Sequence, residues 1–196
     1  MQRFLHGIDR FSMWSGKITA WIIVAMVLLV AFDVTMRYLS KPFDWIINIW
    51  FTYNYSYDMS YYLYGMFFML GGAYALSRGQ MVRGDVFYRL WPVRVQASVD
   101  LVLYIVAFFP GILALVSVGA QWAAASWEIQ ERSFTSAAAP PIYPLKMVIP
   151  VAGALIAIQG VAETIRAFQA VRSGVWPRRL ADVEETETLL AKQVEV

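Results

Sequence analysis

The chain has 196 residues, of which 59% are hydrophobic and only 15% are charged, and the apolar residues are concentrated in blocks. This composition disfavours a soluble domain of this size. The formal net charge of +2 is too small to indicate a nucleic-acid partner. Without Cys, the chain has no thiol–disulfide chemistry and no Cys-ligated metal, and its lone His6 cannot supply the paired axial ligands of a membrane haem. We therefore expect no cofactor.

Four long uncharged runs, at residues 18–32, 59–77, 101–127 and 147–162, approach or exceed the about 20 residues that cross a bilayer. Of the 16 Lys and Arg residues, 12 lie in the N-terminal segment, the second connection and the C-terminal segment. Because cytoplasmic segments carry the excess of basic residues, this pattern predicts that both termini lie in the cytoplasm. We expect an all-α integral membrane protein with four transmembrane helices.

We expect the first span at about residues 17–39, uncleaved, because no small-x-small cleavage site follows the apolar run. Residues 43–51, which include Trp45 and Trp50, predict a short amphipathic helix in the headgroup plane. A membrane anchor explains these aromatic residues better than a ligand cage, because aromatic belts occur at any bilayer interface.

The second span, at about 58–77, carries small residues at Gly71 and Gly72, which predict close helix contacts within this chain or with a partner. In the connection that follows, we expect Arg78, Arg83 and Asp85 to fix the loop by pairing with one another, with a partner or with anionic headgroups.

The third span, at about 96–127, contains Pro110, which predicts a kink because proline lacks a backbone donor. The fourth, at about 145–168, follows a Pro-rich lead-in and carries Gly153 as a further close-contact position. Lys146 and Arg166 bracket it, and we expect both to reach the headgroups. Residues 1–196 thus read as one membrane domain, with residues 169–196 as a cytoplasmic tail.

The ionisable residues of the spans favour local pairing over a transport role. Three acid–base pairs have helical spacing, and Gln159 is expected to form an interhelical hydrogen bond. The pairs are Asp33 with Arg37, Glu128 with Arg132, and Glu163 with Arg166.

Two stretches together resemble a known family. The first runs from Gly72 through Arg78, Gly79, Arg83 and Asp85, at the end of the second span and in the next loop. The second comprises Trp127, Glu131, Ser133, Pro140, Pro141, Tyr143, Pro144, Lys146, Pro150, Gln159, Gly160, Glu163 and Arg166. In this order they resemble the small, DctQ-like membrane subunit of tripartite ATP-independent periplasmic (TRAP) transporters, over roughly residues 17–168.

The resemblance implies a non-enzymatic permease subunit of the bacterial inner membrane. It implies that a large, DctM-like, sodium-coupled subunit and a periplasmic substrate-binding protein are its partners, together with membrane lipids, in the uptake of an organic acid or similar anion. Gly71, Gly72, Arg78, Arg83, Asp85, Gly153, Gln159 and Glu163 are then candidates for contact with the large subunit or lipid. Candidates for docking the binding protein are Trp45, Trp50, Trp127, Glu128, Glu131, Arg132, Tyr143 and Lys146.

One alternative stays open at this point, which is a structural anchor or assembly subunit of another bacterial inner-membrane complex. The missing His and Cys ligands argue against an anchor that bears a cofactor, but not against a bare one. An intramembrane enzyme lacks support, since no Gly-x-Ser-x-Gly or His-Glu-x-x-His motif is present.

Overall fold

The computed structural model describes residues 2–39, 51–79, 88, 90–134, 139–180 and 182. The expected interfacial helix at 43–51, with Trp45 and Trp50, lies outside the described residues except for residue 51, at which the second helix begins. Arg83 and Asp85 also lie outside them. The predictions on these four residues are therefore not tested.

The fold is all-helical, and the described part of the chain contains no β-strand. Its elements in order are α1 (Gln2–Leu39), α2 (Phe51–Ser77), α4 (Val93–Leu103), a π-helical turn η1 (Tyr104–Phe108), α5 (Phe109–Glu128) and α6 (Tyr143–Ser173). Helix α1 is longer than the expected first span, because it begins at Gln2 rather than near residue 17.

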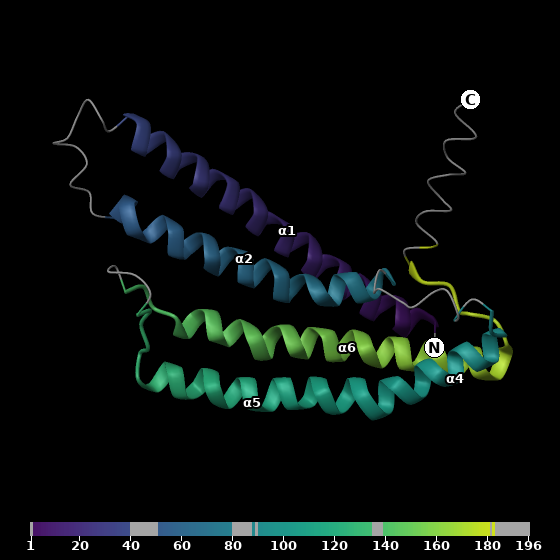
Figure 1. Cartoon of the computed structure of the whole chain (residues 1–196). Coiled ribbons are helices and arrows are strands. Elements are labelled where there is room, and N and C mark those ends of the chain that lie inside the picture. The colour runs from purple at the N-terminus through teal and green to yellow at the C-terminus, as the bar shows by residue number, and fades with distance from the viewer. Residues whose placement is uncertain are drawn as a thin grey trace, which may run out of the picture.

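The helices run up and down beside one another, with α5 and α6 lying side by side, α2 along α6, and α1 crossing α2 (Figure 1). Helix α6 contacts each of the other elements. The beginning of α1 and the end of α6 lie at one end of the bundle, and the end of α1, the beginning of α2 and the beginning of α6 lie at the other (Figure 1). Residues far apart in sequence therefore meet at the two ends of α6.

Three helical stretches are long and apolar enough to cross a membrane: Gln2–Thr35, Val93–Glu128 and Tyr143–Ser173. In the most apolar window of Val93–Glu128, no residue is buried by the rest of the chain. Extensive exposed apolar surface of this kind is typical of contact with lipid or with another membrane protein. Helix α2 has 27 residues but does not reach the same hydropathy, since its sequence contains several Tyr and Gly residues. The fourth span and the orientation stay predictions.

Small residues fill the spaces between the helices, and most of the buried apolar side chains are Ala. A Cβ atom added at Gly72 would lie 2.9 Å from Ile156 Cδ1, and one added at Gly153 would lie 2.7 Å from Val116 Cγ2. These two glycines mark close contacts of α6 with α2 and with α5, as the sequence predicts. At Gly71 no described atom lies within 4 Å of such a Cβ, so the expected contact is not made within the described part of this chain, and contact with a partner stays a prediction.

The helical stretch Val93–Glu128 is interrupted just before Pro110, where the sequence predicts a kink. The Phe109 N–H donates to the Tyr104 carbonyl five residues back, which closes a π-helical turn. Helix α4 leaves the line of α5 at this point (Figure 1). The wider turn places the Phe108 ring against Gly160 of α6, where a Cβ would overlap the ring.

Substituting Gly160 tests this packing. The Phe108 ring is held edge-on between Tyr104 and Phe109, at centroid distances of 5.2 and 5.5 Å, so it cannot easily move away from a new methyl group. We expect Gly160→Ala to lower the free energy of unfolding by about 1–3 kcal/mol. The measurement is equilibrium unfolding of the purified chain in detergent micelles.

Gly111→Ala is the matched control, because no described atom lies within 4 Å of a Cβ at that glycine. A helical Gly→Ala change without a clash leaves stability unchanged or raises it by up to about 1 kcal/mol. Equal effects of the two substitutions would contradict the packing described here.

Candidate functional site: polar clusters at the two ends of α6

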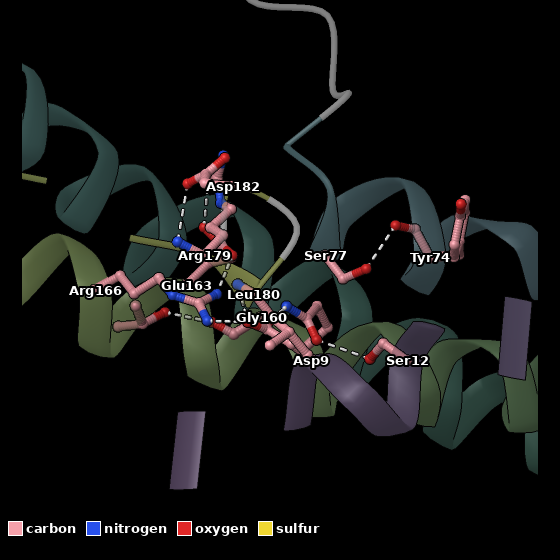
Figure 2. Close-up of polar contacts among 12 residues, drawn as sticks. Asp9, Ser12, Tyr74, Ser77, Gly160, Glu163, Arg166, Arg179, Leu180 and Asp182 are labelled. Atoms are coloured by element: carbon pink, nitrogen blue, oxygen red, sulfur yellow. Dashed lines mark hydrogen bonds and ion pairs between the residues drawn. The ribbon is translucent and has the colours of Figure 1, made fainter. Parts of the chain in front are cut away.

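Charged side chains from three parts of the chain meet near the end of α6, in what we call the buried charge network: Asp9, Glu163, Arg166 and Arg179. Figure 2 shows how α1, α6 and the segment after α6 converge there. Arg166 is 1% exposed and Asp9 is also 1% exposed. Charges this deeply buried are costly unless each is paired and hydrogen-bonded.

The Arg166 guanidinium connects two carboxylates. Its Nη1 donates to Glu163 Oε1 at 2.6 Å, and its Nη2 donates to Asp9 Oδ2 of α1. The other oxygen of Glu163 accepts from Arg179 Nη2 at 2.9 Å. Two guanidinium groups thus pair with two buried carboxylates, and the carboxylate of the exposed Asp182 accepts from the main-chain N–H of Arg179 at 2.9 Å.

Gln159 extends the network by one turn of α6. Its Nε2 donates to Asp9 Oδ1 at 3.0 Å, and its Oε1 accepts from the Ser12 hydroxyl at 2.7 Å. The interhelical hydrogen bond expected of Gln159 is therefore present, and it joins α6 to α1. Gln159, Glu163 and Arg166 share one face of α6 because they are spaced by one and two helical turns.

The segment after α6 folds back onto this network. Gly174 ends the helix in the left-handed conformation with φ of 75°, which favours glycine, and its N–H donates to the Ala170 carbonyl at 2.8 Å. The Leu180 N–H then reaches Asp9 Oδ2 at 3.3 Å. A Cβ at Gly79, which has φ of 67°, would overlap the Arg179 guanidinium. Arg179 and Leu180 of the expected solvated tail thus contact the bundle.

Several sequence-based expectations about these charges need correction. Arg166 does not reach the headgroups, because Asp9 and Glu163 hold it inside the bundle. Lys146 is also nearly buried, since it turns inward to Glu131. Of the expected local pairs, Glu163 with Arg166 is formed, whereas no ion pair joins the exposed Glu128 and Arg132, both of which the structure describes. The Arg37 side chain is not described, so its pair is not tested.

Sequence reasoning missed Asp9, Ser12 and Arg179. The segment before residue 17 was expected to lie outside the span, so its polar residues were not considered as partners of α6. A usable signal was present, because Leu5, Asp9 and Ser12 follow helical spacing and all three are buried. Arg179 had no such signal, since only the turn at Gly174 brings it back.

At the other end of α6, the turn between α5 and α6 is organised by Glu131. The Lys146 ammonium donates to Glu131 Oε2, which also accepts from the Ser126 hydroxyl at 2.7 Å. Lys146 Nζ also lies 4.1 Å from the centre of the Trp122 ring. We call these four residues the turn cluster. It joins the end of α5 to the beginning of α6 through side chains.

Main-chain and aromatic contacts complete this end of the bundle. The Ile142 N–H donates to the Glu131 carbonyl at 3.0 Å, and the Ser133 N–H donates to the Pro140 carbonyl at 2.8 Å. The rings of Trp127 and Tyr143 meet edge to face with centroids 4.7 Å apart. Of the expected docking residues, the structure brings together Trp127 with Tyr143 and Glu131 with Lys146, and it leaves Glu128 and Arg132 exposed.

The chemistry of the two clusters is that of ion pairing. The described residues contain no group of three or more His, Cys, Asp or Glu that could hold a metal ion. A cavity of about 510 Å³ beside Arg179 is lined mainly by apolar side chains from α2, α4 and η1. In the turn cluster, hydrogen bonds from Lys146 and then Ser126 lower the pKa of Glu131 below its ordinary value.

The lowered pKa of Glu131 makes the stabilising effect of the turn cluster depend on pH. A carboxyl whose pKa is lower in the folded chain stabilises the fold above its unfolded pKa, and this effect is lost as the pH falls through the folded value. We therefore expect Glu131→Gln to lower the unfolding temperature at about pH 7, and the difference from the unmodified chain to shrink below about pH 4. Thermal unfolding in detergent at both pH values measures this difference in unfolding temperature.

Glu128→Gln is the matched control, because Glu128 is exposed and forms no ion pair among the described residues. It should unfold like the unmodified chain at both pH values. A Glu131→Gln difference that is the same at both pH values would show that the carboxylate charge does not stabilise this turn.

Comparison with known proteins agrees with the resemblance found in the sequence. The family model for the DctQ component of tripartite ATP-independent periplasmic transporters matches residues 26–170, which is more than half of the chain. A search of curated proteins finds no match. The matched range contains the whole turn cluster together with Glu163 and Arg166, whereas Asp9 and Arg179 lie outside it. This family is a transporter component and not an enzyme, and the chain belongs to it, as a small DctQ-type subunit of a TRAP transporter.

Proposed function

We propose that this chain is a scaffold subunit that does not itself carry substrate. It holds a large DctM-like subunit in the bacterial inner membrane and helps a periplasmic substrate-binding protein dock on the complex. In this proposal the chain crosses the membrane four times, with both termini in the cytoplasm, because most Lys and Arg residues flank those ends. The large subunit couples sodium to the uptake of an organic acid or similar anion.

The ion pairing within the buried charge network carries the proposal. A route for ions or protons needs ionisable groups that can exchange their partners within the membrane. In the network, Arg166 is fixed by Asp9 and Glu163 at once, and Glu163 is held on its second oxygen by Arg179. Such an arrangement is typical of a rigid element, so we infer that the moving and coupling parts belong to the partner.

The end of the bundle that holds the turn cluster supports the docking role. Glu131, Lys146 and the paired rings of Trp127 and Tyr143 fix the shape of this surface. Glu128 and Arg132 remain exposed there, with charges of opposite sign. Exposed charges at the rim of an interface mainly set the rate of encounter, which suits a partner that must bind and leave repeatedly. The alternative, an anchor for an unrelated complex, is disfavoured by the family match.

Reconstituted uptake tests both parts of the proposal. Liposomes that contain this chain alone should show no sodium-dependent uptake of a labelled organic acid, whereas liposomes with the large subunit and the binding protein should. In the complete system, Glu128→Lys should lower uptake several-fold when the binding protein is limiting and less when it is saturating, because reversing a rim charge slows encounter.

Arg172→Glu is the control for charge reversal, since Arg172 is also exposed but lies at the opposite end of α6. It should leave the dependence on the binding protein unchanged. Clear uptake by this chain alone would contradict the scaffold role, and a Glu128→Lys complex that responds normally to limiting binding protein would contradict the docking surface.

A further inference from the structure

One exposed face of α2 combines large aromatic rings with tyrosine hydroxyls. Tyr57, Tyr61, Tyr64 and Phe68 follow one another at spacings of four and three residues, and Gly71 continues the same row. Residues so spaced lie on one side of a helix. The four rings are between 57% and 73% exposed, and no described atom lies within 4 Å of a Cβ built at Gly71. We call these five residues the aromatic face.

The opposite side of α2 makes its contacts within the chain. Ala73 and Leu76 are buried, and Gly72 meets Ile156 of α6. The packing of this chain therefore does not use the aromatic face. Because the five residues span more than three turns of helix, the face is long enough for a second helix to lie along it.

Lipid tails are a poor match for this face. The exposed apolar residues of η1 and α5 include Val106, Leu113 and Val118, which are aliphatic and need no hydrogen-bond partner. On α2, the Tyr64 side chain is 57% exposed, and its hydroxyl forms no hydrogen bond within the part of the chain that the structure describes. Tyr64 lies about 9 Å further along the helix axis than Asp58, where the expected span begins, so an interfacial belt does not account for it. A hydroxyl placed in hydrocarbon without a partner is costly.

The rings of the aromatic face already contact one another within this chain. Tyr57 and Tyr61 meet edge to face at 4.9 Å, and their hydroxyl oxygens are 3.0 Å apart. Tyr64 stacks with Phe68 at a centroid distance of 6.5 Å. Aromatic rings with few rotatable bonds are the usual anchors of protein interfaces, and a glycine at the end of their row lets a neighbouring helix approach closely.

We propose that the aromatic face of α2 is the surface on which a transmembrane helix of the large subunit packs. This inference rests on the proposed function, because it names the partner and the face within that scaffold. The matching surface on the large subunit offers a hydrogen-bond acceptor opposite Tyr64 and a small or aliphatic side chain opposite Gly71. Helix α2, whose most apolar window has a lower hydropathy than those of the three other long helical stretches, is then shielded from lipid by protein on both sides.

Site-directed photo-crosslinking tests this proposal directly, and the absence of Cys from the chain means that no native thiol must be removed. Phe68→Cys and Leu113→Cys, on exposed positions of α2 and α5, are each labelled with a thiol-reactive benzophenone in the isolated chain, which is then assembled with the large subunit. We expect a covalent adduct with the large subunit from position 68 and none from position 113. An adduct from position 113 alone, equal adducts from both, or adducts from position 68 only with lipid or a second copy of this chain would overturn it.

A second variant separates assembly from folding. Gly71→Leu should reduce recovery of the complex by roughly tenfold, because the added side chain blocks the approach of the partner helix. The isolated chain should keep its unfolding temperature, since the space beside Gly71 is open. Gly111→Leu, at an open glycine of α5, should leave recovery unchanged. Full recovery of the Gly71→Leu complex would overturn the proposal, whereas failure of the unmodified chain to co-purify with a large subunit would overturn the proposed function itself.

Discussion

A guanidinium group in the interior of a helical membrane bundle must be neutralised and hydrogen-bonded, and Arg166 imposes this requirement on the rest of the fold. Glu163 satisfies part of it from the same helix, but Asp9 must come from the other end of the chain. Helix α1 therefore has to continue back to Gln2, well before its most hydrophobic part. Arg179 then balances the second carboxylate, which requires the chain to turn at Gly174 and return.

Helix α6, which carries Arg166, also has close neighbours along its length, and its many small residues allow this. Glycines and alanines of α6 face the other helices: Gly153 lies close to Val116 of α5, and Gly160 accepts the Phe108 ring of the π-helical turn. Gly72 of α2 in turn lies close to Ile156 of α6. Dispersion contacts between closely spaced helices replace much of the hydrophobic driving force, which is weak between helices in lipid. Helices α1, α2 and α5 then supply much of the outer surface of the bundle.

The sequence predicts the elements better than it predicts their partners. Apolar runs predict an all-helical membrane protein, and helical spacing predicts the pair of Glu163 with Arg166 and the hydrogen bond of Gln159. Spacing along one helix cannot show which side chains of another chain segment will face it. For this reason the expectation that Lys146 and Arg166 reach the headgroups is wrong. The sequence also does not predict that Asp9 is a partner of α6, or that it accepts a hydrogen bond from Leu180, which is 171 residues away. Gly71 has the same small-residue signal as Gly72, yet only the packing shows that it faces outward.

The most direct test of the central role of Arg166 is the free energy of unfolding of Arg166→Met in detergent, compared with Arg172→Met on the same helix. Removing one partner from a buried ion network leaves uncompensated charge, so we expect Arg166→Met to lower the free energy of unfolding by about 3–5 kcal/mol. Arg172 is exposed and lies 5.7 Å from the centre of the Phe168 ring, so its loss should cost no more than about 1 kcal/mol. Equal stability of the two variants would contradict the conclusion that the buried charge network holds the two ends of this chain together.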